Sequence, residues 1–338
     1  MPIGAFISGC SGTSLVAGES EFFRRANPWG LILFRRNCET PDQLLKLTAD
    51  FRATVGRRDA PVFVDQEGGR VQRLGPPSNS WRKYPPARSY GELYEKNALD
   101  ALRSARHVGR LMAEDLIAAG ITANCVPILD VPQPGSHDVI GNRAYSMNRD
   151  HIIALARAHA AGFMDGGVLP VVKHLPGHGR AKADSHLGLP VVDASLEELQ
   201  RTDFPPFAAF ADAPMAMTAH VVYTALDKAA PATLSAKIIK KVIREQIGFR
   251  GLLMTDDISM KALSGTFAEK CQRALKAGCD IVLHCSGDFA EMEEVAAASG
   301  SLKGKSLRRA RAALKQARKP QPFDRKLALK DLEALVSG

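Results

Sequence analysis

Residues 169–190 read LPVVKHLPGHGRAKADSHLGLP, and this stretch carries the pattern that decides the fold. It begins with a short apolar run, residues 169–172, which ends in Lys173 and His174. A long polar segment rich in glycine follows, and such a segment continues neither a helix nor a strand. A short apolar run that ends in charged residues and enters a long loop is typical of buried parallel strands in α/β proteins.

The same arrangement recurs along the chain. Eight short apolar runs are mostly followed by glycine, proline or polar residues: Ala5–Ser8, Leu31–Phe34, Pro61–Asp65, Ala123–Asp130, Leu169–His174, Ala216–His220, Leu252–Asp256 and Ile281–His284. Helical patterns lie between several of them, for example at residues 41–55, 101–120 and 151–167. Eight strand-and-helix units, spaced at about 39 residues each, predict an α/β fold with a single TIM-type (β/α)8 barrel.

An open, doubly wound sheet is the alternative fold. Such a sheet usually has fewer strands and a glycine-rich phosphate loop after the first of them. Here the first run enters SGCSGTS at residues 8–14, which lacks the G-x-G-x-x-G spacing. Two long loops, at residues 75–90 and 177–190, instead follow strand ends, where barrel enzymes carry their functional residues.

The composition excludes several classes of protein. The 338 residues are 45% hydrophobic and 24% charged, which is typical of a globular chain and not of a disordered, collagen-like or coiled-coil one. No apolar run reaches 18 residues, so we expect no membrane span. The N-terminus lacks the pattern of a signal peptide, and none of the six cysteines forms C-x-x-C. We therefore expect a cytoplasmic protein with reduced thiols.

The net charge of +9 comes from one segment. Residues 301–330 hold eleven basic residues and one acidic residue, whereas residues 1–300 hold 34 basic and 33 acidic ones. We interpret this segment as a solvated helix face, with weak binding of acidic polymers as the alternative. The sequence thus predicts a barrel domain at residues 1–300 and a basic C-terminal helical extension at residues 301–338, packed on the barrel or trailing it.

Polar residues end six of the eight runs. They are Asp65, Asp130, Lys173 with His174, His220, Asp256 with Asp257, and His284. The ends of parallel strands meet at one rim of a barrel, so these side chains should converge there. Because charge at a barrel mouth costs desolvation, we expect this rim to be functional.

The segment 173–186 allows two interpretations. His174, His178 and His186 could bind a metal, but Pro176 and the neighbouring glycines exclude the helix on which H-x3-H ligands usually lie. The segment could instead be a catalytic loop in which Asp184 orients His186 and raises its pKa for proton transfer. An exposed histidine beside an unrelated aspartate stays a third possibility.

Carboxylates mark two more strand ends. In the run that ends in Asp256 and Asp257, side chains alternate, so one acid can enter the pocket while the other binds a structural partner. An inward carboxylate suits a glycosyl nucleophile, a base or a metal ligand. The segment 65–73, DQEGGRVQR, adds Asp65, Arg73 and two glycines that could let the backbone approach a ligand.

Four motifs together resemble family 3 glycoside hydrolases, and in particular the single-domain bacterial β-N-acetylglucosaminidases of cell-wall recycling. The motifs are DQEGGRVQRL at residues 65–74, GNRAYS at 141–146, KHLPGHG with ADSH at 173–186, and MTDDISM at 254–260. The sequence departs from the family pattern at Leu175, where phenylalanine is common, and at Thr255, where serine is common.

The resemblance implies the roles of the site residues. Asp256 corresponds to the nucleophile, His186 to the proton donor and acceptor, and Asp184 to its partner. The residues that correspond to contacts with the sugar ring are Asp65, Arg73, Arg143, Lys173 and His174. We also expect no cofactor and no metal, because the loop histidines lie among helix-breaking glycine and proline residues and His186 is needed as a free base.

The implied activity is the removal of N-acetylglucosamine from N-acetylglucosaminyl-1,6-anhydro-N-acetylmuramic acid, with or without peptide, through a covalent intermediate. We expect a monomer that binds this saccharide and neither nucleic acid nor a membrane. Three alternatives stay open: a phosphorylase in which phosphate replaces water, a metal-dependent barrel hydrolase, and a barrel that binds sugar without turnover.

Overall fold

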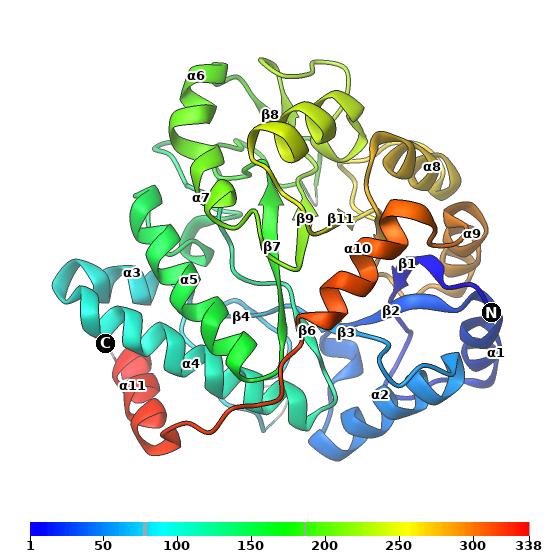
Figure 1. Ribbon diagram of the computed structural model, residues 1–338, viewed down its shortest axis with the longest axis horizontal. Coiled ribbons are helices and arrows are strands. Elements are labelled where there is room, and N and C mark those ends of the chain that lie inside the picture. Colours follow the sequence, from blue (N-terminus) through cyan, green and yellow to red (C-terminus); the bar gives the residue numbers. More distant parts are fainter. Residues whose placement is uncertain (77–79, 186, 338) are drawn as a thin grey trace.

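A computed structural model describes residues 1–76, 80–185 and 187–337 of the chain. Eight parallel strands form a closed barrel that is surrounded by helices (Figure 1). In their order around the barrel the strands are β1 Gly4–Ser8, β12 Ile281–His284, β11 Leu252–Asp257, β9 Met215–Thr218, β7 Leu169–Leu175, β6 Ala123–Asn124, β3 Val62–Val64 and β2 Pro28–Leu33. The predicted (β/α)8 barrel is confirmed.

Alternation of side chains along each strand separates two parts of the core. On β12, Ile281 and Leu283 face the barrel interior, where they pack with residues such as Trp29 and Met254. Val282 between them belongs to the layer that packs against the helices. Each strand is thus buried on both sides, which explains why the sequence shows continuous apolar runs and no polar alternation.

Helices cover the outside of the barrel. The longer ones are α1 Ala17–Ala26, α2 Pro41–Val55, α3 Ala87–Lys96, α4 Ala98–Ala118, α5 Arg149–Asp165, α8 Phe267–Ala277 and α9 Phe289–Ser299. Between β7 and β9 lie α6 Leu196–Glu198, the π-helical segment η3 Leu199–Asp203 and α7 Phe204–Ala209, and η5 Ile238–Gln246 precedes β11. Sequence signals set the ends of α2, because Thr40 accepts a hydrogen bond from the amide of Gln43 and Gly56 adopts a positive φ.

Two small sheets lie outside the barrel. β4 (Gln66–Gly68) pairs antiparallel with β5 (Val71–Gln72), and β8 (Val191–Val192) pairs with β10 (Val222–Tyr223). The predicted strand Ala123–Asp130 is too long, because its barrel strand ends at Asn124. Pro127 has no amide hydrogen to donate, so only an isolated bridge between Ile128 and Lys173 continues the pairing toward the rim.

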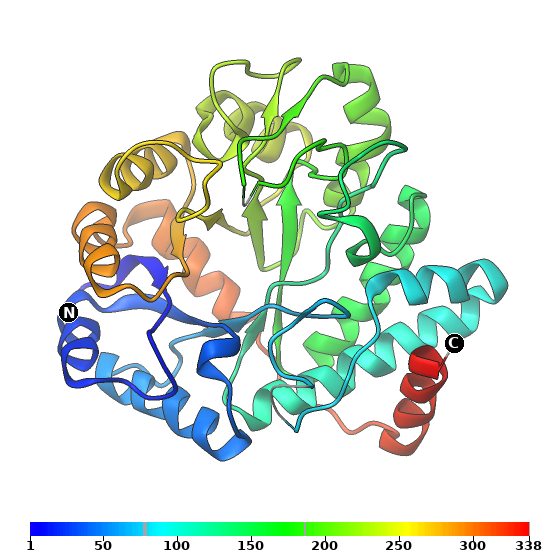
Figure 2. The same cartoon turned by 180° about the vertical axis from the view of Figure 1, so that it is seen from behind.

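Two helices make up the C-terminal segment. α10 (Gly304–Lys315) buries Ala310 and Ala313 against the apolar cluster at the amino ends of the strands, opposite the predicted functional rim. α11 (Arg325–Ser337) packs on α4 on the outside, as the two views in Figures 1 and 2 show. Within the residues that the structure describes, no helix combines the length and apolarity needed to cross a bilayer.

The packing of α10 leads to a prediction for the domain boundary at residue 300. A chain truncated after Leu302 loses this apolar contact and the bonds that Ser306 and Arg309 donate to Asp280, at 2.8 and 3.0 Å. We expect its Tm to fall by on the order of 10 °C. The kcat of the soluble fraction on a small glycoside should stay unchanged, because α10 is remote from the rim. A large fall in kcat at an unaltered Tm would show that the segment takes part in catalysis.

Candidate active site

A cavity of about 240 Å³ opens at the carboxyl ends of the barrel strands. Six of the residues predicted for the site line it together: Asp65, Arg73, Arg143, Lys173, His174 and Asp256. They come from β7, β11 and the loops after β3 and β6. The rim expected from the strand ends therefore forms one compact polar cavity.

A network of buried charges forms one wall. The ammonium of Lys173 lies 2.8 Å from Asp65 Oδ1 and 2.8 Å from Glu67 Oε1. Arg143 donates two hydrogen bonds to Glu67, at 2.8 and 2.9 Å, and Arg73 lies 3.3 Å from Asp65. Each cation is thus held in one orientation while it lines the cavity.

The charges in this wall stabilise one another. Burial by itself raises the pKa of a carboxyl, but Lys173 and the neighbouring arginines lower the pKa of Asp65 well below its usual range. The pKa of Glu67 falls to about 2 because Arg143 and Lys173 outweigh its burial. In turn, Asp65 and Glu67 raise the pKa of Lys173 against the effect of its burial. Asp65, Glu67 and Lys173 therefore stay ionised at neutral pH.

Glu67 is the site residue that the sequence analysis missed. A detectable signal existed, because Glu67 follows Asp65 by two positions on an extended segment, and such residues point to the same side. Its side chain is only 5% exposed, so its two cationic partners are what make its burial tolerable.

We expect Glu67→Gln to lower kcat/KM by on the order of 10- to 100-fold, because Lys173 and Arg143 then share one anion fewer and lose their fixed orientation. Steady-state kinetics on a small glycoside measure this. Glu19→Gln is a matched control, since Glu19 is also buried but binds backbone amides of residues 11 and 16. Equal losses in both variants would mean that a general loss of stability causes the effect.

Asp256 lies at the end of β11 and lines the cavity. Met254, two positions earlier, faces the barrel interior, so alternation directs Asp256 inward as well. Burial by itself raises the pKa of Asp256, but His174, His220 and Lys173 together lower it below the ordinary value. The site therefore holds an ionised carboxylate in a secluded position.

Asp257 is engaged differently, although it also borders the cavity. Its carboxylate accepts hydrogen bonds from the amide and hydroxyl of Ser259, at 3.0 and 2.5 Å, and from the amide of Cys285 at 3.2 Å. The bond from Cys285 joins the end of β11 to the end of β12, and the bonds from Ser259 fix the turn that follows β11. Asp256 thus points into the cavity while Asp257 binds structural partners, as the alternation of side chains along the strand predicts.

His174 is oriented by a buried carboxylate. Its Nδ1 lies 2.7 Å from Asp130 Oδ2, and the amide of His178 donates to Asp130 Oδ1 at 2.6 Å. Asp130 is fully buried, and burial would raise its pKa, but His174 and His178 lower it. Because Nδ1 faces the carboxylate, the Nε2 edge of His174 is the one available toward the cavity.

The loop after β7 enters the cavity from the side. His178 and Ser185 line the cavity, and His178 Nε2 lies 3.2 Å from Ser185 Oγ. Burial lowers the pKa of His178 to about 4, so it is neutral. Asp184 adjoins Ser185 in this loop, and its carbonyl accepts hydrogen bonds from the amides of Leu187 and Gly188, at 3.0 and 3.1 Å. The predicted proton donor His186 lies outside the described residues.

Two histidines predicted at the rim do not line the cavity. His284 packs against the ring of Phe267 and lies 3.0 Å from Glu291, because alternation on β12 turns Leu283 and Cys285 inward instead. The prediction for His284 is therefore wrong. His220 lies between Thr233 Oγ1 and the carbonyl of Asp257, at 2.7 and 3.0 Å, so it supports the end of β11.

The two adjacent glycines Gly68 and Gly69 do not have the role predicted for them, which was to let the backbone approach a ligand. A Cβ atom at Gly68 would lie 2.1 Å from the carbonyl oxygen of Pro85, and one at Gly69 would lie 2.8 Å from Pro86. Both residues have a positive φ. They therefore allow close packing against residues 85–86, and this contact with the chain itself, not one with a ligand, explains the glycines.

The metal hypothesis named His174, His178 and His186, and the last of these lies outside the described residues. Among residues 1–76, 80–185 and 187–337, no group of three or more histidine, cysteine, aspartate or glutamate side chains could hold a metal ion. The Nδ1 of His174 is occupied by Asp130, and Cys285 is buried with its pKa raised well above the ordinary value by its burial and by neighbouring carboxylates.

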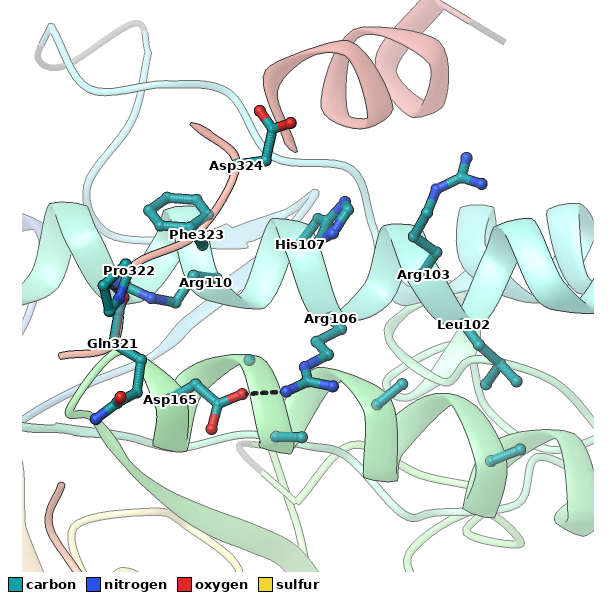
Figure 3. A pocket seen from close by; sticks show the side chains of 14 residues that line it. Leu102, Arg103, Arg106, His107, Arg110, Asp165, Gln321, Pro322, Phe323 and Asp324 are labelled. Carbon is teal, nitrogen blue, oxygen red and sulfur yellow. Dashed lines mark hydrogen bonds and ion pairs between the residues drawn. The ribbon is translucent and has the colours of Figure 1, made fainter. Parts of the chain in front are cut away.

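A larger groove of about 760 Å³ lies on the outer surface (Figure 3). It runs between α4 and α5 under residues 321–324. Its basic side chains already have acidic partners, such as Asp165 for Arg106 at 2.7 Å and Asp331 for His107 at 2.7 Å. The smaller cavity at the barrel mouth therefore carries the chemistry, in agreement with the position of active sites in barrel enzymes.

Known proteins share this architecture and sequence. The model of the glycosyl hydrolase family 3 N-terminal domain matches residues 19–318. A β-hexosaminidase from Methylococcus capsulatus is 39% identical over 279 residues, which cover 81% of this chain and 80% of the relative.

Solved structures agree with this assignment. Native NagZ from Neisseria gonorrhoeae superposes with a TM-score of 0.83 at 32% identity, and the match covers 100% of this chain and 99% of that one. The same protein in complex with N-trifluoroacetyl-D-glucosamine gives a TM-score of 0.82 at 31% identity, over 100% and 99% of the two chains. With fold, polar cavity and sequence in agreement, the chain belongs to glycosyl hydrolase family 3 and is a β-hexosaminidase.

Proposed function

We propose that this enzyme is a retaining, exo-acting β-N-acetylglucosaminidase that removes non-reducing N-acetylglucosamine from peptidoglycan fragments. The fragments are N-acetylglucosaminyl-1,6-anhydro-N-acetylmuramic acid with or without peptide, and the setting is cell-wall recycling in the cytoplasm. The observation that carries the proposal is Asp256, an ionised carboxylate at the wall of a small cavity that also contains a fixed array of charged hydrogen-bonding groups.

The size of the cavity supports exo action. At about 240 Å³ it is smaller than the roughly 300–1,000 Å³ of sites for drug-sized ligands, which suits a single sugar ring. Asp65, Arg73, Arg143, Lys173 and His174 would bind the hydroxyl and carbonyl oxygens of that ring. Their mutual ion pairs keep them oriented before the sugar arrives, which reduces the entropy lost on binding.

In the proposed reaction the carboxylate of Asp256 attacks the anomeric carbon and forms a covalent glycosyl-enzyme. His186, oriented by Asp184, gives its proton to the leaving oxygen in the same step. The neutral imidazole then takes a proton from water, which attacks the anomeric carbon and releases the sugar with retained configuration. A histidine and aspartate pair here replaces the carboxyl that most retaining enzymes use.

The remaining parts of the proposal concern the setting. The six cysteines are free and buried, which agrees with a reducing compartment. The glucosamine derivative bound by the gonococcal NagZ supports a saccharide as the ligand of this cavity. We propose a monomer that acts without cofactor or metal and binds neither nucleic acid nor a membrane.

The test is the reaction of the purified protein with a chromogenic β-N-acetylglucosaminide, followed by NMR of the first-formed sugar. We expect the β-anomer of N-acetylglucosamine, and the α-anomer as the first product would refute the retaining mechanism. A glycosyl phosphate formed on addition of phosphate would favour the phosphorylase. Loss of activity with a chelator and its recovery with zinc would favour the metal-dependent hydrolase. Binding of the glycoside without turnover would favour a non-catalytic barrel.

A further inference from the structure

Asp203 is a buried carboxylate outside the cavity. It lies at the junction of η3 and α7, and its side chain has 0% exposure. The residues around it in sequence, Leu199, Phe204 and Phe207, are buried and apolar. Its Oδ2 accepts a hydrogen bond from Arg180 Nε at 2.7 Å, whereas its Oδ1 is buried with no hydrogen-bond partner among the described residues.

A buried ion pair of this kind, with one carboxylate oxygen unsatisfied, contributes little to the free energy of unfolding. Burial raises the pKa of Asp203 to about 6 although Arg180 acts in the opposite direction. Buried ion pairs with an unsatisfied oxygen often contribute less to the free energy of unfolding than apolar side chains of the same size. The pair is therefore better explained by the position it gives to Arg180 than by stability.

Arg180 belongs to the first arm of the loop after β7, residues 177–181, and this arm is held from several sides. The hydroxyl of Tyr223 donates to the carbonyl of Gly177 at 2.7 Å, and a Cβ atom at Gly177 would lie 3.2 Å from the Cβ of Asp203. On the other side, the amide of His178 is bound to Asp130, and Gly179 packs against the backbone of Val131.

We propose that Asp203 is a positioning residue of the reaction, which acts through Arg180 to fix the arm that leads to the catalytic loop residues. The inference rests on the proposed function, because that function assigns proton transfer to this loop. Asp184 follows Arg180 by only four positions; Ala181 is buried, whereas Lys182 and Ala183 are exposed. The Arg180–Asp203 pair is thus the last side-chain anchor that the described arm makes to the helical layer before Asp184.

A positioning role has a distinct kinetic signature. A general acid must lie within hydrogen-bond reach of the leaving oxygen, and displacement by about 1 Å can cost on the order of 100-fold in rate. This loss affects a substrate with a poor leaving group, such as a disaccharide, more than a nitrophenyl glycoside, whose leaving group needs no proton. The KM of the nitrophenyl glycoside should stay unchanged, because Lys173 and His174 on β7 are held by their own bonds to Asp65, Glu67 and Asp130, and the other sugar contacts lie on other loops.

The experiment compares Arg180→Gln, Asp203→Asn and the double variant with the parent enzyme on both substrates. We expect each single variant to lose about tenfold or more in kcat/KM on the disaccharide and less than about threefold on the nitrophenyl glycoside. The double variant should lose no more than either single one, because both remove the same anchor. Arg180 is partly exposed, so its variant remains informative if Asp203→Asn does not fold.

Arg244→Gln is the matched control. Arg244 and Asp280 form a pair of similar burial, at 2.8 Å and 15% and 2% exposure, near the amino ends of the strands. We expect this variant to have a lower Tm and unchanged activity on both substrates. Equal losses on the two substrates in Arg180→Gln, or no loss at all, would overturn the inference. A parent enzyme inactive on both glycosides would instead refute the proposed function.

Discussion

Asp256→Ala is expected to lower kcat by at least about 10³-fold, which corresponds to about 4 kcal/mol in the activation barrier. The physical reason is that Asp256 is the ionised carboxylate of the cavity that is free to form a bond to the anomeric carbon, since Asp257 is engaged by Ser259 and Cys285. The fold should persist, because alanine at this position leaves the backbone pairing of β11 intact. Steady-state kinetics together with Tm measure the effect.

Asp257→Asn is the matched control for this prediction. It removes the same charge from the adjacent acid, and it weakens the local bonds from Ser259 and the bond from Cys285 that joins the ends of β11 and β12. We expect a lower Tm, with kcat within about tenfold of the parent enzyme. Near-normal activity in a well-folded Asp256→Ala protein would contradict the assignment and make Asp257 the candidate nucleophile.

His186→Ala is expected to slow cleavage of a natural disaccharide by about 10²–10⁴-fold, as the loss of a general acid usually does. Formation of the covalent intermediate from an activated nitrophenyl glycoside should suffer much less, because that leaving group departs without a proton. The intermediate should then accumulate, and azide should restore turnover, since a small anion attacks without a general base. Asp184→Ala should give the same pattern in weaker form, because its carboxylate only orients the imidazole and raises its pKa.

Ser185→Ala is the control within the same loop. Ser185 contacts His178 through its hydroxyl, and its carbonyl accepts a hydrogen bond from Ala262, which the substitution retains. We expect this variant to lower kcat/KM only slightly, and by the same factor on the disaccharide and on the nitrophenyl glycoside. Equal losses on both substrates in His186→Ala would indicate that His186 binds the sugar or holds the loop, and that the proton donor is another group.

The fold was predictable because burial on both faces leaves a continuous apolar run for each strand. This signal located the eight barrel strands, and it overestimated most the length of the one that ends at Asn124, where Pro127 interrupts the pairing. A continuous apolar run does not indicate whether its last side chain faces the cavity or the surrounding helices. His284 was therefore predicted at the cavity, although alternation on β12 turns it toward Phe267.

The charged site was only partly predictable. Strand ends and motifs led to Asp65, Lys173 and Asp256, which the structure brings to one cavity. Glu67 was missed, because its importance lies in contacts with Lys173 and Arg143, which are 106 and 76 positions away in the sequence. Asp203 is of the same kind, since nothing in its own segment indicates that it binds Arg180.

The central claim is that Asp256 forms a covalent bond to the sugar. The most direct measurement is mass spectrometry of His186→Ala after rapid quenching from a dinitrophenyl β-N-acetylglucosaminide, followed by peptide mapping. The account predicts a mass increase of one N-acetylhexosamine residue on the peptide that contains Asp256, with fragmentation locating it on that side chain. An adduct on another residue, or steady turnover with no adduct at any quench time, would contradict the account.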